Sequence, residues 1–296
     1  MIRHDRCPLC SSEKTGLYLK CTDFFISGES FDIHDCRDCG FLFTQEYPSE
    51  ETIHTYYESE DYISHSDTPA GIVNKLYHLA RSIMLRRKRR LIGRLTGLTA
   101  GRLLDVGSGT GHFAAVMMKS GWQVTGIEIS DKAGNYASSR FGVEVVKPVD
   151  VSGLQKASYD CVTMWHVLEH FHRPGEYMTE ILDLLKPGGY CLVALPNSGS
   201  FDAGYYGQHW AAYDVPRHLW HFNPHTLRLF AGKAGLSVIG QVILPFDVFY
   251  ISIMSEKYRK TSFYFLAGGI KGLFFYIRSL FNPEKSSSVL YILKRL

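Results

Sequence analysis

The chain of 296 residues is predicted to be an α/β protein with a doubly wound parallel sheet and a small cysteine-bearing unit at its N-terminus. Short apolar segments alternate with helical segments over residues 102–196, a pattern typical of a parallel sheet covered on both faces. Two Cys-x-x-Cys pairs lie within the first 39 residues, outside that alternation. We therefore expect a ribbon at 1–45, a connector and basic helix at 46–98, and the main domain at 99–296.

The composition is that of a soluble globular protein. Hydrophobic residues make up 45% and charged residues 21% of the chain, which excludes a disordered or collagen-like polymer. The formal net charge of +3 is too balanced to indicate a nucleic acid or an anionic membrane as partner. No apolar run follows Met1, so we expect no secretory signal and a reducing, cytoplasmic location.

The four cysteines of the N-terminal pairs indicate a structural zinc site. Each Cys-x-x-Cys turn can direct two thiolates at one ion, and two turns supply a tetrahedral four-sulfur set. A closed site of this kind has no open position for chemistry. A redox pair is the alternative, although neither pair follows a strand and opens a helix. The expected ligands are Cys7, Cys10, Cys36 and Cys39, with Cys21 and His34 as less favoured substitutes.

The next segment combines an acidic, tyrosine-rich stretch with a basic helix. Residues 46–68 are interpreted as a surface connector, and apolar residues recur at helical spacing from Ile72 to Leu95. The helix carries RRKRR at 86–90, and five successive residues cover about 500° around a helix axis. A solvated helix is therefore expected, with contact to phosphates of a nucleic acid, an anionic lipid or a nucleotide sugar as alternatives.

The main domain is predicted element by element. Asn223 and Pro224 are typical of a helix N-cap and first turn, and Gly235 ends that helix. Cys161 and Cys191 fall in mid-strand positions and are expected to be small core residues. The expected strands are 102–106, 122–129, 143–146, 159–165, 190–196, 236–244 and 287–295, with helices at 112–120, 131–141, 174–185 and 224–234.

A glycine-rich loop follows the first strand of this domain. Glycines permit positive φ angles and a close approach of the backbone to a ligand; here they are Gly107, Gly109 and Gly111, after Asp105. Glu128 ends the next strand, 21 residues after Gly107, where a carboxylate can accept hydrogen bonds from both hydroxyls of a ribose. The third glycine of a dinucleotide loop is replaced by His112, and no Lys-Ser/Thr follows. The loop therefore favours a nucleoside without phosphates.

The chain resembles the class I S-adenosylmethionine-dependent methyltransferases. The resemblance is carried, in order, by LLDVGSGTG, GIEIS, YDCVTMWHVLEH, LKPGGYCLVALPN and a final pair of strands. It implies a seven-stranded Rossmann-like sheet of order 3-2-1-4-5-7-6 with an antiparallel last strand. It also implies S-adenosylmethionine as donor and S-adenosylhomocysteine as product.

The same resemblance implies positions for the donor. Its methionine part would lie over the 107–111 loop, its ribose on Glu128 and its adenine amino group near Asp150, while His166 would stand near the sulfonium. The donor contacts implied in this way are Asp105, Gly107, Ser108, Gly109, Gly111, Glu128, Ile129, Asp150 and His166.

Two inserts interrupt the expected pattern, and the first is rich in histidine. It covers residues 197–223, follows the fifth strand and should lie at the ligand-binding edge of the sheet. Its PRHLWHF segment resembles one found in many bacterial members of this group, often those with glycan or lipid-linked substrates. We expect a substrate pocket, with His166 or His218 as the general base that takes a hydroxyl proton. A metal site or ordinary packing remains the alternative for the histidines of residues 205–225: His209, His218, His221 and His225.

The second insert, 247–284, is apolar. Within it, residues 262–281 have the length of a bilayer span, but Lys271, Arg278 and two adjacent glycines interrupt them. We expect a surface helix or helical pair that covers the pocket, meets a partner subunit or touches a membrane interface.

Three functions follow in order of preference. The first is methyl transfer to a small-molecule, sugar or glycan/lipid-linked acceptor at a hydroxyl. The second is an RNA methyltransferase that uses the ribbon and the basic helix; the low net charge and the absence of an N-P-P-[FY] signature after the fourth strand speak against it. The third is a non-enzymatic module that binds the donor and recruits a partner.

Overall fold

A computed structural model describes residues 1–57 and 72–295 of the chain. The expected connector at 46–68 lies partly outside the described residues. The main sheet has seven strands in the order β10-β11-β8-β7-β4-β5-β6, which is the order 3-2-1-4-5-7-6 counted along the main domain. β11 runs antiparallel to both of its neighbours, as expected. The predicted fold class is confirmed.

The strands of this sheet match the predicted segments closely. They are β4 (Arg102–Val106), β5 (Gln123–Ile127), β6 (Glu144–Val146), β7 (Tyr159–Trp165), β8 (Leu185–Pro196), β10 (Leu236–Ile243) and β11 (Ser288–Arg295). The largest difference is β8, which begins at Leu185 and not at residue 190. Leu185 pairs with Tyr159, and a register shift before Cys161 accommodates the intervening residues.

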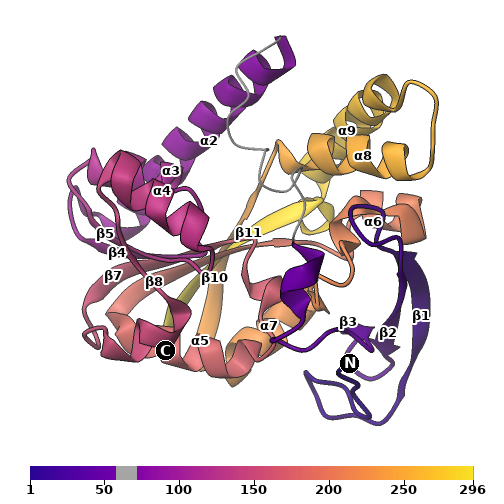
Figure 1. The fold of residues 1–296 in the computed structure, drawn as a ribbon, viewed down its shortest axis with the longest axis horizontal. Helices are drawn as coiled ribbons and strands as arrows, with labels where there is room; N and C mark the ends of the chain where they lie inside the picture. The colour runs from indigo at the N-terminus through magenta and orange to yellow at the C-terminus, as the bar shows by residue number, and fades with distance from the viewer. Residues whose placement is uncertain (58–71, 296) are drawn as a thin grey trace.

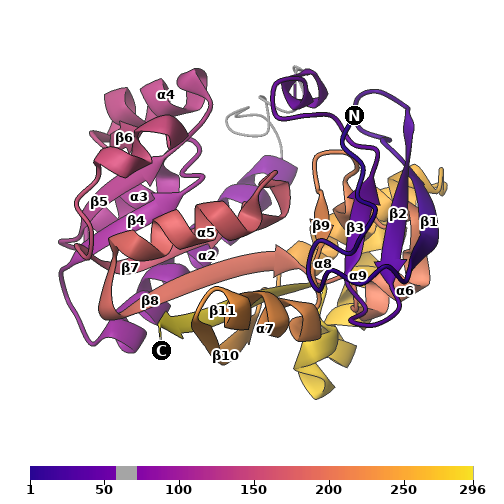
Figure 2. The same cartoon turned by 90° about the horizontal axis from the view of Figure 1, so that it is seen from below.

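Helices cover both faces of the sheet (Figures 1 and 2). One face carries α2 (Ile72–Thr96), α3 (His112–Met118) and α4 (Asp131–Phe141), and the other carries α5 (Pro174–Leu184) and α7 (Pro224–Lys233). The predicted cap of α7 is present: the Asn223 side chain accepts from the Thr226 amide, and Thr226 accepts from the Asn223 amide.

The N-terminal residues form a second sheet that includes a strand from the histidine-rich insert. Its order is β1-β2-β3-β9, with β1 (Thr15–Thr22), β2 (Ser30–Cys36), β3 (Leu42–Gln45) and β9 (Trp220–His221). β3 and β9 are antiparallel, with Leu42 opposite His221 and Phe43 opposite Trp220. The N-terminal unit is thus tied to the main domain at the expected ligand-binding edge.

The two inserts form helices. α6 (Phe201–Tyr206) precedes β9, while α8 (Asp247–Tyr258) and α9 (Tyr264–Phe281) form the helical pair expected within 247–284. Gly268 allows the close packing of that pair, because a Cβ there would lie 2.4 Å from the Ile253 Cα. None of the described helices is long and apolar enough to cross a bilayer.

Candidate functional site

The glycine loop after β4 has the backbone that its sequence predicts. Gly107, Gly109 and Gly111 have φ angles of 68°, 53° and 75°, a region that L side chains rarely adopt. A Cβ on Gly107 would lie 2.4 Å from Val167 Cγ2, and one on Gly111 would lie 2.7 Å from the Cβ of Ala137. These two glycines therefore serve close packing as well as the turn, and neither position tolerates a side chain.

Asp105 is buried beneath this loop and faces a lysine from the basic helix. Thr163 donates a hydrogen bond to Asp105 Oδ1 at 2.7 Å. Burial raises the pKa of Asp105 to about 7, although Thr163 and Lys88 oppose the rise. Burial likewise lowers the pKa of Lys88 to about 8, against the attraction of Asp105 and Asp247. Because both side chains are buried, water screens the attraction between their opposite charges only weakly.

Glu128, at the end of β5, holds the loop in place. Its Oε2 accepts from the Gly109 amide and its Oε1 from the Ser130 amide, each at 2.8 Å. Of the other expected donor contacts, Ser108 is buried in the loop, Ile129 is 78% exposed and Asp150 is exposed in the 3₁₀ turn η2 (Pro148–Gly153). The structure thus brings together the loop and Glu128, with Asp150 following the neighbouring strand β6.

His166, directly after β7, lies between two carboxylates. Its φ of 58° is unusual for a residue with a side chain. Its Nε2 lies 3.0 Å from Asp247 Oδ2, and its Nδ1 lies 3.5 Å from Glu169 Oε1. Burial lowers the pKa of His166, but both carboxylates outweigh it and raise it to about 10. At neutral pH this imidazole carries a proton, which is the opposite of what a general base needs.

His218 lies beside Glu169 and His170, which belong to the 3₁₀ turn η3 (Leu168–His170). The rings of His170 and His218 meet edge to face with centroids 4.6 Å apart. His218 Nδ1 lies 2.8 Å from the Ala212 carbonyl, which can only accept, so Nδ1 carries a hydrogen. Its other nitrogen, Nε2, lies 3.9 Å from Asp214 Oδ2, beyond hydrogen-bond distance, whereas Nε2 of His166 is bound to Asp247 at 3.0 Å.

The remaining histidines of the insert have packing roles or face solvent. His221 is buried against Thr44, and burial together with His218 lowers its pKa to about 3. His209 stacks on Phe24, and His225 is exposed on α7. Of the insert histidines expected in the pocket, His218 therefore remains as the candidate. It lies with His166 and His170, which follow β7, around Glu169.

Arg217, in the PRHLWHF segment, joins the insert to the N-terminal unit through hydrogen bonds and ion pairs. Its guanidinium is 1% exposed and reaches Asp23 Oδ1 and Asp214 Oδ1, each at 2.7 Å. It also donates to the Tyr56 carbonyl at 3.0 Å. This segment, which the sequence associates with substrate, positions its neighbour His218 through these bonds.

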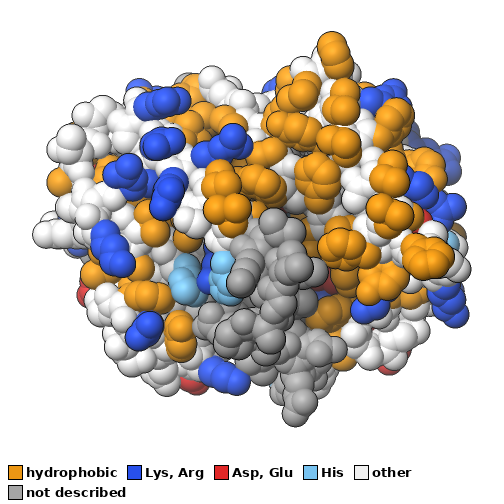
Figure 3. Space-filling model, turned by 90° about the horizontal axis from the view of Figure 1, so that it is seen from above, with side chains coloured by type: hydrophobic (Ala, Val, Ile, Leu, Met, Phe, Trp, Pro, Cys, Tyr) orange, Lys and Arg blue, Asp and Glu red, His pale blue; other side chains and the backbone are white. Residues whose placement is uncertain are grey.

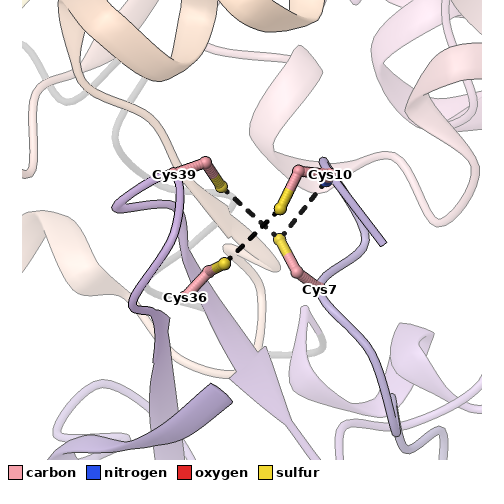
Figure 4. Close-up of side chains that lie close together, drawn as sticks. All are labelled: Cys7, Cys10, Cys36 and Cys39. Carbon is pink, nitrogen blue, oxygen red and sulfur yellow. Dashed lines mark hydrogen bonds between the residues drawn. The ribbon is translucent and has the colours of Figure 1, made fainter. Parts of the chain in front are cut away.

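The four cysteines converge as expected for a zinc site (Figure 4). Sγ of Cys7 lies 3.7 Å from that of Cys39, and Sγ of Cys10 lies 3.5 Å from that of Cys36. Tetrahedral zinc with bonds of about 2.3 Å separates its sulfurs by about 3.8 Å. The geometry fits a zinc ion, and the substitutes Cys21 and His34 are not part of the cluster.

The basic helix is only partly the solvated helix that its sequence predicts. Arg86, Arg87, Arg89 and Arg90 are exposed. Lys88 instead turns inward, with its Nζ 3.6 Å from the centre of the Trp165 ring, a cation–π contact. Lys88 therefore belongs to the site below the glycine loop, unlike the four arginines of the RRKRR segment.

Sequence reasoning did not identify Lys88, Glu169, His170 or Asp247 as site residues. Glu169 and His170 are adjacent in the WHVLEH stretch, which carries part of the resemblance. A carboxylate next to an imidazole at the end of a strand could therefore have been identified as a candidate site from the sequence. Lys88 lies within a run of five cations and Asp247 begins an apolar insert, and neither context distinguishes it.

Comparison with known proteins agrees with this geometry. Residues 78–241 match the family model of a methyltransferase domain. A ubiquinone biosynthesis O-methyltransferase from Bordetella avium is 32% identical over 56% of this chain and 73% of its own length. Another from Xanthomonas euvesicatoria pv. vesicatoria is 31% identical over 48% of this chain and 64% of its own length. The chain therefore spans about two thirds of the length of these relatives.

Solved structures share the fold. Magnesium protoporphyrin IX methyltransferase from Synechocystis PCC 6803, with bound S-adenosylhomocysteine, has a TM-score of 0.56 at 14% identity, over 84% of this chain and 100% of that one. A SAM-dependent methyltransferase from Archaeoglobus fulgidus has a TM-score of 0.50 at 20% identity, over 73% and 94%. On the family match, the chain belongs to the methyltransferase domain family and is a class I S-adenosylmethionine-dependent methyltransferase.

Proposed function

We propose that this enzyme transfers a methyl group from S-adenosylmethionine to a hydroxyl of a small-molecule, sugar or lipid-linked acceptor. The main support is that this chain is 32% identical to an O-methyltransferase over 73% of that relative's length. The His218 imidazole, with Nδ1 held by a backbone carbonyl, supports it because a hydroxyl acceptor needs a group that can take its proton.

The donor would lie across the loop at the carboxyl ends of β4, β5 and β6. Gly107 to Gly111 would face its methionine part, Glu128 would accept from the ribose hydroxyls, and Asp150 would contact the adenine amino group. The Gly109 and Ser130 amides now occupy both Glu128 oxygens, and each oxygen has a second lone pair for a hydroxyl.

The transfer itself is an in-line displacement. The acceptor oxygen forms a bond to the methyl carbon while the carbon–sulfur bond breaks, and the bond's electron pair returns to sulfur to give S-adenosylhomocysteine. The hydroxyl proton passes to Nε2 of His218. Most of the rate would come from proximity and orientation of the two substrates.

A product assay tests the acceptor class. Purified protein and S-adenosylmethionine are incubated with phenols, nucleotide sugars, lipid-linked sugars and total RNA, and S-adenosylhomocysteine is measured. We expect turnover with a hydroxyl-bearing small molecule or lipid-linked sugar, reduced in His218→Asn but not in the exposed His225→Asn. Turnover with RNA alone would overturn the proposal and favour the RNA alternative.

Substitution of Glu128 tests the placement of the ribose. Glu128→Ala should weaken S-adenosylhomocysteine binding by about 1.5–3 kcal/mol, the scale of hydrogen bonds to a charged group. Glu128→Gln, which keeps one accepting oxygen, should lose less. Calorimetry measures both, and an unchanged affinity in Glu128→Ala would show that the ribose lies elsewhere.

The exposed face of α9 suggests that the acceptor is met at a membrane. Hydrophobic side chains gather over α8 and α9 in Figure 3. Seven hydrophobic side chains on α9 are half or more exposed: Phe265, Leu266, Ile270, Leu273, Phe274, Leu280 and Phe281. Residues 257–281 contain five Lys or Arg and no acidic residue. An apolar face with a basic rim fits an anionic lipid surface.

Sedimentation with vesicles tests this contact. We expect the protein to pellet with vesicles of mixed neutral and anionic lipid, and less with neutral vesicles. The double variant Phe265→Ser/Phe274→Ser should stay in the supernatant, while Leu79→Ser, an exposed apolar residue on α2, should behave as wild type. Equal recovery of both variants in the pellet would contradict a lipid-facing α9.

A further inference from the structure

A cluster of one carboxylate and two imidazoles lies between η3 and the histidine-rich insert, apart from the four cysteines. The ligand atoms of Glu169, His170 and His218 lie within 4.8 Å of one another. A tetrahedral zinc ion with bonds of about 2.0–2.1 Å would bring such atoms to about 3.4 Å. Binding would therefore draw the three ligand atoms closer together than they lie in this structure.

Both imidazoles are oriented as metal ligands usually are. Nδ1 of His170 lies 3.0 Å from the Arg217 carbonyl and 2.9 Å from the Tyr57 hydroxyl, and Nδ1 of His218 lies 2.8 Å from the Ala212 carbonyl. Because a carbonyl only accepts, each carbonyl contact needs a hydrogen on Nδ1, which leaves Nε2 as the ligand nitrogen; at His170 the Tyr57 hydroxyl shares the same Nδ1. A backbone acceptor behind each ring is the usual support of a histidine ligand.

The carboxylate supplies an independent indication of a missing partner. Glu169 is 1% exposed, and no described residue hydrogen-bonds to either of its oxygens. Among the described residues, the cation within ion-pair distance of Glu169 is His166, whose Nδ1 lies 3.5 Å from Oε1 while its Nε2 lies 3.0 Å from Asp247 Oδ2. Two carboxylates thus share one imidazolium, and a second cation at Glu169 would supply the charge that the shared one leaves uncompensated.

We propose that Glu169, His170 and His218 form a binding site for a divalent transition-metal cation of the zinc class. Two imidazoles and one carboxylate form a ligand set of catalytic zinc sites, which leave a position open for water or substrate. The side chain of His218 is 12% exposed, whereas Glu169 is 1% exposed, so His218 is the ligand nearer to solvent.

The role of such a cation rests on the proposed function. A bound metal lowers the pKa of a coordinated hydroxyl, so the acceptor's O–H bond would break with release of the proton to water before the oxygen attacks the methyl carbon. With the metal bound, Nε2 of His218 would hold the ion, and this release of the proton to water would replace the transfer to His218 described for the metal-free enzyme. The cysteine site cannot take this part, because its four thiolates leave no open position.

Cobalt titration of the full-length protein tests the site. The protein is first loaded with one zinc per chain, which fills the cysteine site, and Co²⁺ is then added and followed by calorimetry and absorption. We expect one further equivalent to bind without a sulfur-to-cobalt charge-transfer band. Affinity should fall at least 30-fold in Glu169→Gln and in His218→Ala, and remain in His225→Ala.

Anomalous scattering from cobalt-soaked wild-type crystals tests the same site without relying on the folding of a variant. We expect an anomalous peak between Glu169, His170 and His218. Absence of a second equivalent and of that peak would overturn the proposal, as would unchanged Co²⁺ affinity in both variants. Cobalt bound at the cluster with no methyl transfer to any hydroxyl acceptor would leave the metal site standing and contradict the proposed function instead.

Discussion

Replacement of Arg217 with glutamine is expected to lower the free energy of unfolding by about 3–5 kcal/mol at pH 7, the usual cost of removing one partner from a buried ion pair. The guanidinium is 1% exposed and pairs with Asp23, which is 0% exposed, and with Asp214. Without it, the buried Asp23 carboxylate would keep only the bonds from its own turn. Urea unfolding followed by fluorescence measures the loss.

The same variant makes a prediction about pH. Burial alone would raise the pKa of Asp23, but hydrogen bonds from Arg217 and Ser27 lower it below its ordinary value. Stability from a carboxyl with a depressed pKa is full above the unfolded-chain pKa of about 4 and is lost as pH falls through the folded-state pKa. The deficit of Arg217→Gln should therefore shrink below about pH 4. The exposed Arg86→Gln is the control, and an equal deficit at pH 3 and pH 7 would contradict the ion-pair explanation.

We propose that the four cysteines hold zinc, and removal of that ion is expected to destabilise the protein strongly. Apparent zinc-binding free energies of four-ligand sites are about 10–16 kcal/mol, and they are coupled directly to folding. Cys7, Cys36 and Cys39 are buried in the same core cluster as Trp220 of β9, so loss of the ion should destabilise the N-terminal sheet together with the insert. A strong chelator should lower the melting temperature and increase hydrogen exchange in both segments.

Cys39→Ser should reproduce the effect of chelation, whereas Cys21→Ser, in the same sheet but outside the cluster, should retain one zinc per chain. Donor binding should survive nearly intact, because the glycine loop and Glu128 follow β4 and β5 of the main sheet, whereas the N-terminal strands pair with β9 of the insert in a separate sheet. Loss of S-adenosylhomocysteine binding along with zinc would mean that the N-terminal sheet supports the whole fold.

Local sequence patterns predicted most of the elements because their causes are local. The alternation of apolar segments and the Asn223 cap depend on residues a few positions apart, and both are observed. The order of the seven strands came from the family resemblance and not from periodicity. The convergence of the four cysteines was predictable, since two turns of that spacing have one common purpose.

The remaining features depend on contacts between distant segments. The pairing of Phe43 with Trp220 joins an N-terminal strand to an insert without periodicity. Lys88 turns toward Asp105 only because α2 packs beside the sheet, and the same run could have remained fully solvated. Asp247, at the start of α8 in the second insert, meets His166 at the end of β7, so the protonated state of that histidine could not be inferred from its place in the sequence.

Titration calorimetry of the purified protein with S-adenosylmethionine and S-adenosylhomocysteine, with NAD and ATP as controls, tests whether the glycine loop and Glu128 bind a methyl donor. We expect micromolar binding of both sulfur ligands at one site per chain and no binding of the phosphate-bearing controls. No binding of either sulfur ligand, or equal binding of NAD, would contradict the assignment of the loop after β4 and Glu128 as a methyl-donor site.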